Sequence, residues 1–163
     1  MSIYIGIDPG VSGAVAILGP SVELHDAPVR KVKGGNQYLP AEMAAILRPY
    51  AHQRPYALLE VARPPMRAPG QGSGNISAAF RIGEGYGLWV GVLAALGIPY
   101  ELIAASVWKK GIGLVAGADK KASRALAQQL FPHSAGELGK RRPDFAEALL
   151  LAETARRRVG GGA

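Results

Sequence analysis

A chain of 163 residues is about the length of one domain, and its composition, 48% hydrophobic and 19% charged, excludes global disorder. The absence of cysteine excludes a disulfide scaffold, a thiolate zinc site and a cysteine nucleophile. No apolar run reaches the roughly 20 residues of a membrane span, and no basic region precedes the first apolar stretch. We therefore expect a soluble cytoplasmic protein with no membrane partner.

The net charge of +7 is unevenly distributed along the chain. Residues 105–163 hold eleven lysines and arginines against five acids, which leaves +6 in this segment. A polyanion is the natural partner of such a segment, and nucleic acid is the commonest polyanion. The alternative is a basic protein whose arginines reflect a GC-rich genome.

The first half of the chain predicts strands. Residues 3–7 and 13–18 are short strand-like runs, and residues 22–25 resemble a third strand. Gly/Pro turns separate the three, which predicts an antiparallel meander. Residues 31–38 are polar and contain glycine, which predicts a loop, and residues 41–47 have helical spacing after Pro40. A buried strand over residues 56–59 precedes a loop over residues 63–75.

The second half predicts helices around one further strand. Helical spacing covers residues 77–96, 106–110, 120–130 and 143 to about 158, and residues 100–103 predict the fifth strand. This order predicts an α/β fold with a five-stranded mixed sheet, an antiparallel meander plus two parallel strands, flanked by helices. We expect one domain over residues 1–159 and a flexible glycine-rich tail over residues 160–163.

Four acids stand where strands end or a helix begins. Asp8 and Glu60 close two apolar strands, and Asp144 and Glu147 share one face in the first turn of the last helix. Ligands of open α/β sheets gather beyond the carboxyl ends of strands. The set favours hard oxygen ligands for Mg²⁺ or Mn²⁺. Taken singly, Asp8 also suits a turn, and Asp144 and Glu147 also suit a helix N-terminus, whereas Glu60 has no such role.

Five segments, in order, resemble the motifs of RuvC-type Holliday-junction resolvases of the ribonuclease H-like superfamily. They are residues 5–13 (IGIDPGVSG), 58–60 (LLE), 107–113 (VWKKGIG), 119–123 (DKKAS) and 142–150 (RPDFAEALL). The resemblance spans about residues 3–153. The chain departs from the family at Glu147, where many bacterial members have Asp. It also departs in the loop after Glu60, which lacks the bacterial junction-wedging aromatic and leaves Met66 and Phe80 as candidate wedges.

The resemblance implies a ribonuclease H-like fold and a homodimeric endonuclease that nicks two strands of a four-way DNA junction, leaving 5′-phosphate and 3′-hydroxyl ends. It also implies two Mg²⁺ ions per active site, replaceable by Mn²⁺, which together can clamp a phosphoryl displacement. Asp8 is the candidate bridging ligand, Glu60 would hold one ion, and Asp144 and Glu147 would hold the other. The setting would be a bacterial cell or a virus-infected bacterial host.

The lysines of the two central segments have two interpretations, a solvated helix face or phosphate contacts. The resemblance favours Lys109 and Lys120 as catalytic, although each stands beside a second lysine. The candidate DNA contacts are Lys110, Lys121, Arg124, Arg141 and Arg142. Trp108 is interpreted as a packing anchor.

Three other functions fit part of the sequence. A ribonuclease acting on RNA or on an RNA–DNA hybrid could use the same acids. A DNA-binding module without catalysis would need only the basic residues. A small ATPase or sugar kinase has a phosphate loop similar to residues 8–13, but such proteins need two domains of this kind.

Overall fold

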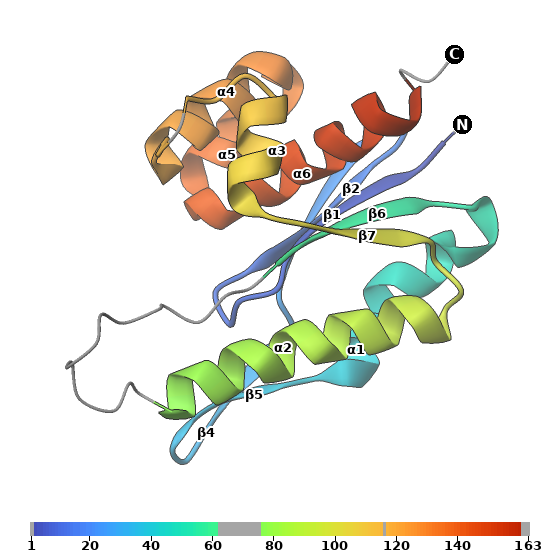
Figure 1. Ribbon diagram of the computed structural model, residues 1–163, viewed down its shortest axis with the longest axis vertical. Coiled ribbons are helices and arrows are strands. Elements are labelled where there is room, and N and C mark those ends of the chain that lie inside the picture. The colour runs from blue at the N-terminus through green and yellow to red at the C-terminus, as the bar shows by residue number, and fades with distance from the viewer. Residues whose placement is uncertain (1, 62–75, 116, 161–163) are drawn as a thin grey trace.

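The computed structural model describes residues 2–61, 76–115 and 117–160 (Figure 1). Its main sheet has five strands in the order β3-β2-β1-β6-β7. The strands β1 (Tyr4–Asp8), β2 (Ala14–Leu18) and β3 (Val22–Asp26) pair antiparallel. The strands β6 (Tyr56–Glu60) and β7 (Tyr100–Ile103) add parallel to β1. The predicted five-stranded mixed sheet is confirmed.

Helices cover both faces of the sheet, because each central strand is apolar on both sides. The helices α1 (Pro40–Leu47) and α2 (Ile76–Ala95) pack on the face that carries Ile5, Ile7 and Leu59. The other face, with Ala16 and Leu58, meets α6 (Pro143–Gly160). The helices α3 (Ala105–Gly111), α4 (Lys120–Leu130) and α5 (Ala135–Lys140) pack around α6 (Figure 1). None of the described helices is both long and apolar enough to cross a membrane.

Gly6 sets the distance between the sheet and α6. A Cβ atom at this position would lie 2.0 Å from the carbonyl oxygen of Ala148 and 2.5 Å from the backbone nitrogen of Ala152. Only a residue without a side chain lets the helix backbone come this close to β1. The first turn of α6, which carries two of the candidate acids, is thereby held close to the strand that ends in Asp8.

The prediction of a loop over residues 31–38 was wrong. Strands β4 (Val29–Val32) and β5 (Gly35–Tyr38) form a separate antiparallel hairpin. Val32 pairs with Gly35, so the turn between the strands is Lys33–Gly34, and Gly34 has a positive φ that glycine adopts without strain. The prediction did not include α5 or the short 3-10 helices Arg48–Gln53 and Pro132–Ser134.

Other segment boundaries differ by a few residues. Gly160 belongs to α6 and not to the predicted tail, whereas residues 161–163 lie outside the described residues. The predicted loop over residues 63–75 also lies outside them, and so does the candidate wedge Met66. The other candidate wedge, Phe80, lies on α2 with 71% of its surface exposed.

Candidate active site

Asp8 and Glu60 lie at the same edge of the sheet because their strands run parallel. Ile7 pairs with Leu59, so the next residue on each strand, Asp8 and Glu60, ends its strand beside the other. Neighbouring strands are about 4.8 Å apart. Ile7 and Leu59 pack toward α1 and α2. Since side chains alternate between the faces of a strand, Asp8 and Glu60 project toward the face that α6 covers.

Asp144 and Glu147 approach this edge from α6. Both are buried, each with 6% of its surface exposed, so neither is a solvated acid at a helix N-terminus. Burial raises the pKa of Asp8 most, and the charges of Asp144 and Glu147 raise it further, against a hydrogen bond from the Gly10 amide. Asp8 thus accepts a hydrogen bond within the turn, as its sequence position suggests. The charges of the two α6 acids also raise the pKa of its carboxyl.

Glu60 belongs to the same electrostatic group. Burial raises the pKa of its carboxyl, and the charges of Asp8 and Glu147 add to that effect. A hydrogen bond from the indole nitrogen of Trp108 and the charge of Lys109 oppose it. The four acids that were predicted from three separate segments therefore act on one another in the folded chain.

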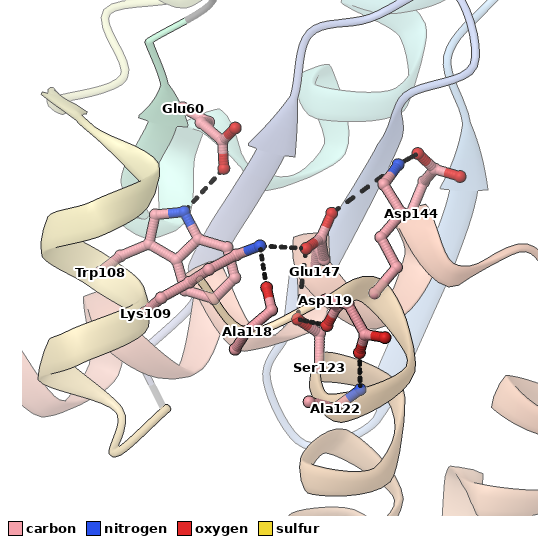
Figure 2. Close-up of polar contacts among 10 residues, drawn as sticks. Glu60, Trp108, Lys109, Ala118, Asp119, Ala122, Ser123, Asp144 and Glu147 are labelled. Atoms are coloured by element: carbon pink, nitrogen blue, oxygen red, sulfur yellow. Dashed lines mark hydrogen bonds and ion pairs between the residues drawn. The ribbon is translucent and has the colours of Figure 1, made fainter. Parts of the chain in front are cut away.

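Two lysines neutralise part of this negative charge (Figure 2). Lys109 Nζ lies 2.7 Å from Glu147 Oε1. Lys120 Nζ lies 2.5 Å from Asp144 Oδ1 and 3.9 Å from Glu147 Oε2. Burial lowers the pKa of Lys120, but its hydrogen bond to Asp144 and the nearby carboxylate charges outweigh burial, so the pKa is raised and the ammonium stays charged.

The second lysine of each pair does not reach the acids. Lys110 and Lys121 are exposed, and neither forms an ion pair within the described ranges. Their positions remain compatible with the predicted contacts to DNA phosphates. Of these four lysines, Lys109 and Lys120 are the two that pair with the carboxylates.

Two positioning side chains were missed in the sequence. The Trp108 indole is fully buried and donates a hydrogen bond of 2.7 Å from Nε1 to Glu60 Oε2, so it is a packing anchor and also a partner of an acid. The Ser123 hydroxyl, also fully buried, lies 3.2 Å from Glu147 Oε1. Figure 2 shows the Trp108 and Ser123 side chains beside these acids. In the sequence, Trp108 directly precedes Lys109 and Ser123 follows Lys120 by three residues, which was the available signal.

The predicted arginine contacts are engaged within the protein. Arg124 donates to the carbonyl oxygen of Arg141 at 2.6 Å. Arg141 also pairs with Glu137 at 2.7 Å and lies over the Phe145 ring, while Arg142 pairs with Asp26. These exposed or half-exposed pairs are weak enough to exchange for phosphate.

The donor set fits a divalent cation on its chemistry. Four carboxylates against two lysines leave an excess of negative charge, which adds to the effect of burial in raising the pKa values of Asp8 and Glu60. Such oxygen-rich sites suit Mg²⁺ and Mn²⁺. Among the described residues, however, no three acids or histidines are arranged to hold a metal ion. The lysines occupy oxygens of Asp144 and Glu147, and Glu60 faces the indole, so metal binding requires these side chains to exchange partners.

A pocket of about 430 Å³ opens beside the acids. It lies between the ends of β1 and β6 and the start of α3, and its lining includes Asp8, Gly10, Glu60 and Ser106. The strand-end carboxylates can therefore be reached from solvent through this pocket.

Comparison with known proteins supports one family. No protein-family model matches the chain. Over 122 residues it is 37% identical to the chloroplastic Holliday junction resolvase MOC1 of Chlamydomonas reinhardtii. The match covers 74% of this chain but 14% of MOC1, so the chain spans only a small part of that relative.

Two solved structures share the fold. The RuvC structure of Thermus thermophilus is 17% identical, with a TM-score of 0.55 over 97% of this chain and 96% of RuvC. RuvC from the same organism in complex with a Holliday junction substrate is also 17% identical, with a TM-score of 0.59 over 98% and 97% of the two chains. The chain thus has the ribonuclease H-like fold of RuvC, and the resemblance to RuvC-type resolvases in its motifs is confirmed.

Proposed function

We propose that this chain is a metal-dependent endonuclease that resolves four-way DNA junctions by paired nicks. The observation that carries the proposal is the meeting of two strand-end acids, two acids of α6 and two lysines at one edge of the sheet. The substrate is supported by MOC1, which is named as a Holliday junction resolvase, and by the RuvC structure that holds a junction. The activity belongs in a bacterial cytoplasm or a virus-infected bacterial host.

Asp8, Glu60, Asp144 and Glu147 would hold two Mg²⁺ ions, for which Mn²⁺ can substitute. Asp8 is central in this assignment, because the charges of both α6 acids act on it and its own charge acts on Glu60. Two such ions, when bound, supply activation of water and stabilisation of the charge that develops on the phosphate and the leaving 3′ oxygen. The cleavage then leaves 5′-phosphate and 3′-hydroxyl ends.

The neighbouring side chains orient the acids and bind the backbone. Trp108 fixes the carboxylate of Glu60, and Ser123 fixes that of Glu147. Lys109 and Lys120 neutralise the acids in the free protein and donate to phosphate oxygens when the carboxylates take up metal. The positive charge of these lysines thus stays at the reacting phosphate, where negative charge grows in the transition state.

Paired nicks require two active sites, so we propose a homodimer. One face of α2 presents Gly83, Gly87 and Gly91, and a Cβ atom added at any of them would meet nothing within 4 Å. Phe80, one turn before Gly83, is 71% exposed. Small residues at four-residue spacing let a second helix approach closely, which makes this face of α2 our candidate dimer contact.

The decisive test is cleavage of end-labelled substrates in Mg²⁺, Mn²⁺, Ca²⁺ and EDTA. We expect symmetric nicks in a four-way junction with Mg²⁺ or Mn²⁺, and far less cleavage of linear duplex, RNA–DNA hybrid and RNA. Asp8→Asn should reduce nicking by more than about 10²-fold, since losing a mere partner of a metal ligand already costs 10–100-fold.

Asp119→Asn is the matched control. Its carboxylate caps α4 by accepting from the Ala122 amide at 2.9 Å, and an asparagine oxygen accepts the same hydrogen bond. This variant should cleave like the wild type. Faster cleavage of the hybrid than of the junction would instead establish a ribonuclease, and junction binding without nicking in any metal would establish a binding module.

A further inference from the structure

The β4–β5 hairpin forms a second basic surface, in the part of the chain with little excess charge. Arg30, Lys31 and Lys33 are exposed, and residues 27–41 contain no aspartate or glutamate. Within the described parts of the chain, no carboxylate lies within ion-pairing distance of these three cations. Arg30 donates instead to Gln37 across the hairpin at 2.9 Å. The hairpin thus presents positive charge that the fold leaves uncompensated.

The base of the hairpin contacts the turn Asp8-Pro9-Gly10, which we call the catalytic turn. The Tyr38 hydroxyl donates at 3.2 Å to the carbonyl oxygen of Pro9, the residue after Asp8. Burial, then the charges of Glu84 and Asp8, raise the pKa of Tyr38 to about 12, so the hydroxyl keeps its proton at neutral pH. Gly85 of α2 makes room for it, because a Cβ atom there would lie 2.3 Å from the Tyr38 oxygen.

The tip of the hairpin is also held. Arg81 of α2 donates to the carbonyl oxygen of Gly34 in the turn at 3.3 Å. At the base, the Leu39 amide donates to Pro28 at 3.0 Å, which closes the ribbon. Contacts at both ends fix the direction in which the hairpin leaves Asp8. Figure 1 shows it beside α2, on the face of the sheet opposite α3 and α4.

The strand register gives the distance along the hairpin between the basic residues and Tyr38, the residue that contacts the catalytic turn. Val29 pairs with Tyr38, and Lys31 pairs with Asn36, two residues farther along the ribbon. At about 3.3 Å per residue, Lys31 lies roughly 7 Å beyond Tyr38 and Lys33 roughly 13 Å beyond it. One DNA strand advances about 3.4 Å per nucleotide. For a ribbon that runs along the DNA axis, Lys31 and Lys33 would therefore lie beside phosphates about two and four nucleotides beyond the phosphate nearest Tyr38.

We propose that the β4–β5 hairpin is a phosphate-binding arm that holds the sugar–phosphate backbone of one duplex arm of the junction two to four nucleotides from the scissile bond. The inference rests on the proposed function, since it takes DNA as the ligand and Asp8 as the position of the scissile phosphate. It adds a contact surface on the α2 side of the sheet, opposite the lysines and arginines of α3, α4 and α6. The DNA is thus held on both sides of the acids.

The test compares two double variants with equal loss of charge. Lys31→Gln with Lys33→Gln removes the two lysines of the hairpin and leaves Arg30 and its bond to Gln37 intact. Arg48→Gln with Arg54→Gln removes two exposed cations next to the start of β6, at the opposite end of that strand from Glu60. Junction binding is measured by fluorescence anisotropy in Ca²⁺ between 50 and 200 mM salt.

Losing two phosphate contacts should reduce the slope of log K against log salt by about 2. The affinity advantage of wild type over the hairpin variant should therefore change about tenfold across this salt range, whereas the control variant should follow the wild type. Thermal stability and the single-turnover nicking rate at saturating protein should not change. A hairpin variant with the wild-type slope would overturn the proposal.

Neutral methylphosphonate linkages test the distance. Placed two to four nucleotides from the scissile bond, they should weaken binding of the wild type but not of the hairpin variant. Equal weakening of both proteins would overturn the assignment of these phosphates to the hairpin. Failure of the proposed function has a different signature, because a wild type that nicks no substrate in any metal leaves the salt-slope comparison intact.

Discussion

Gly6→Ala tests whether the contact between β1 and α6 positions the acids. The new Cβ would lie 2.0 Å from the Ala148 carbonyl oxygen, where carbon and oxygen ordinarily approach to about 3.3 Å. The helix must therefore withdraw by about 1.3 Å next to Glu147. Overpacking of a well-packed core typically costs about 1–3 kcal/mol, and a 1 Å misplacement of catalytic groups can cost about 10²-fold in rate.

We expect Gly6→Ala to lower the free energy of unfolding in urea by about 2 kcal/mol and to slow single-turnover nicking by about 10²-fold. Gly136→Ala is the matched control for stability, because it adds the same methyl group to an open position within α5, away from the candidate dimer contact, and should stabilise that helix by up to about 1 kcal/mol. A Gly6→Ala protein with wild-type stability and nicking would refute the view that this contact sets the geometry of the acids.

Trp108→Phe should slow nicking and cost about 1.5–3 kcal/mol in unfolding free energy by removing the hydrogen bond to the Glu60 carboxylate. Trp89→Phe, at an equally buried indole whose Nε1 has no partner among the described residues, should leave nicking unchanged; equal slowing in both would contradict the positioning role. Saturating Mg²⁺, near 100 times its Kd, should raise the Tm by about 5–10 °C, and a Tm insensitive to Mg²⁺ would argue against a metal site. Asp8→Asn should stabilise the metal-free protein. Burial raises the pKa of Asp8 in the folded protein above its unfolded value. The wild type therefore loses stability as the pH rises from the unfolded to the folded pKa. The stability gained by Asp8→Asn, measured by urea unfolding, should be small at pH 4 and grow toward pH 8. A constant gain would contradict this.

The main sheet could be predicted because its strands are apolar on both faces and are separated by Gly/Pro turns. Ile5, Ile7, Val15 and Ile17 lie buried in β1 and β2, as continuous apolar runs predict. The hairpin over residues 29–38 was missed for the opposite reason. It buries Tyr38 but exposes most other side chains, so no apolar pattern marks it. The Gly34–Gly35 pair was the local signal for its turn.

The four acids could be chosen from the sequence because strand ends and a helix start are recognisable, but their partners could not. The interpretation of Trp108 as a packing anchor was correct and incomplete, since hydrophobicity does not reveal a hydrogen bond between residues 48 positions apart. That bond exists because α3 follows β7 directly and places Trp108 next to the end of β6. The sequence alone does not show how α3 is placed relative to β6.

Helical phase explains which lysine of α3 reaches the acids. Successive residues of a helix are rotated by about 100° around its axis. A residue two positions after a buried side chain therefore lies on roughly the opposite side of the helix. Trp108 is fully buried, Lys109 is half-buried and Lys110 is exposed. The burial of Trp108 therefore places Lys109, and not Lys110, near the acids. The choice between the two lysines could have been made from the sequence, because Trp108 is large and apolar and directly precedes Lys109.

The same argument selects Lys120 on α4. Ser123 is fully buried, and Lys120 lies three residues before it on the same face, whereas Lys121 lies two residues before it and points away. The helical phase determines which of the two lysines points toward the acids, but not which acid it pairs with. Lys120 meets Asp144 because α4 packs along α6. The helix α6 in turn lies on β1 at backbone contact distance, which depends on the missing side chain of Gly6. A change at Gly6 should therefore move α6 and disturb the ion pair between Asp144 of α6 and Lys120 of α4.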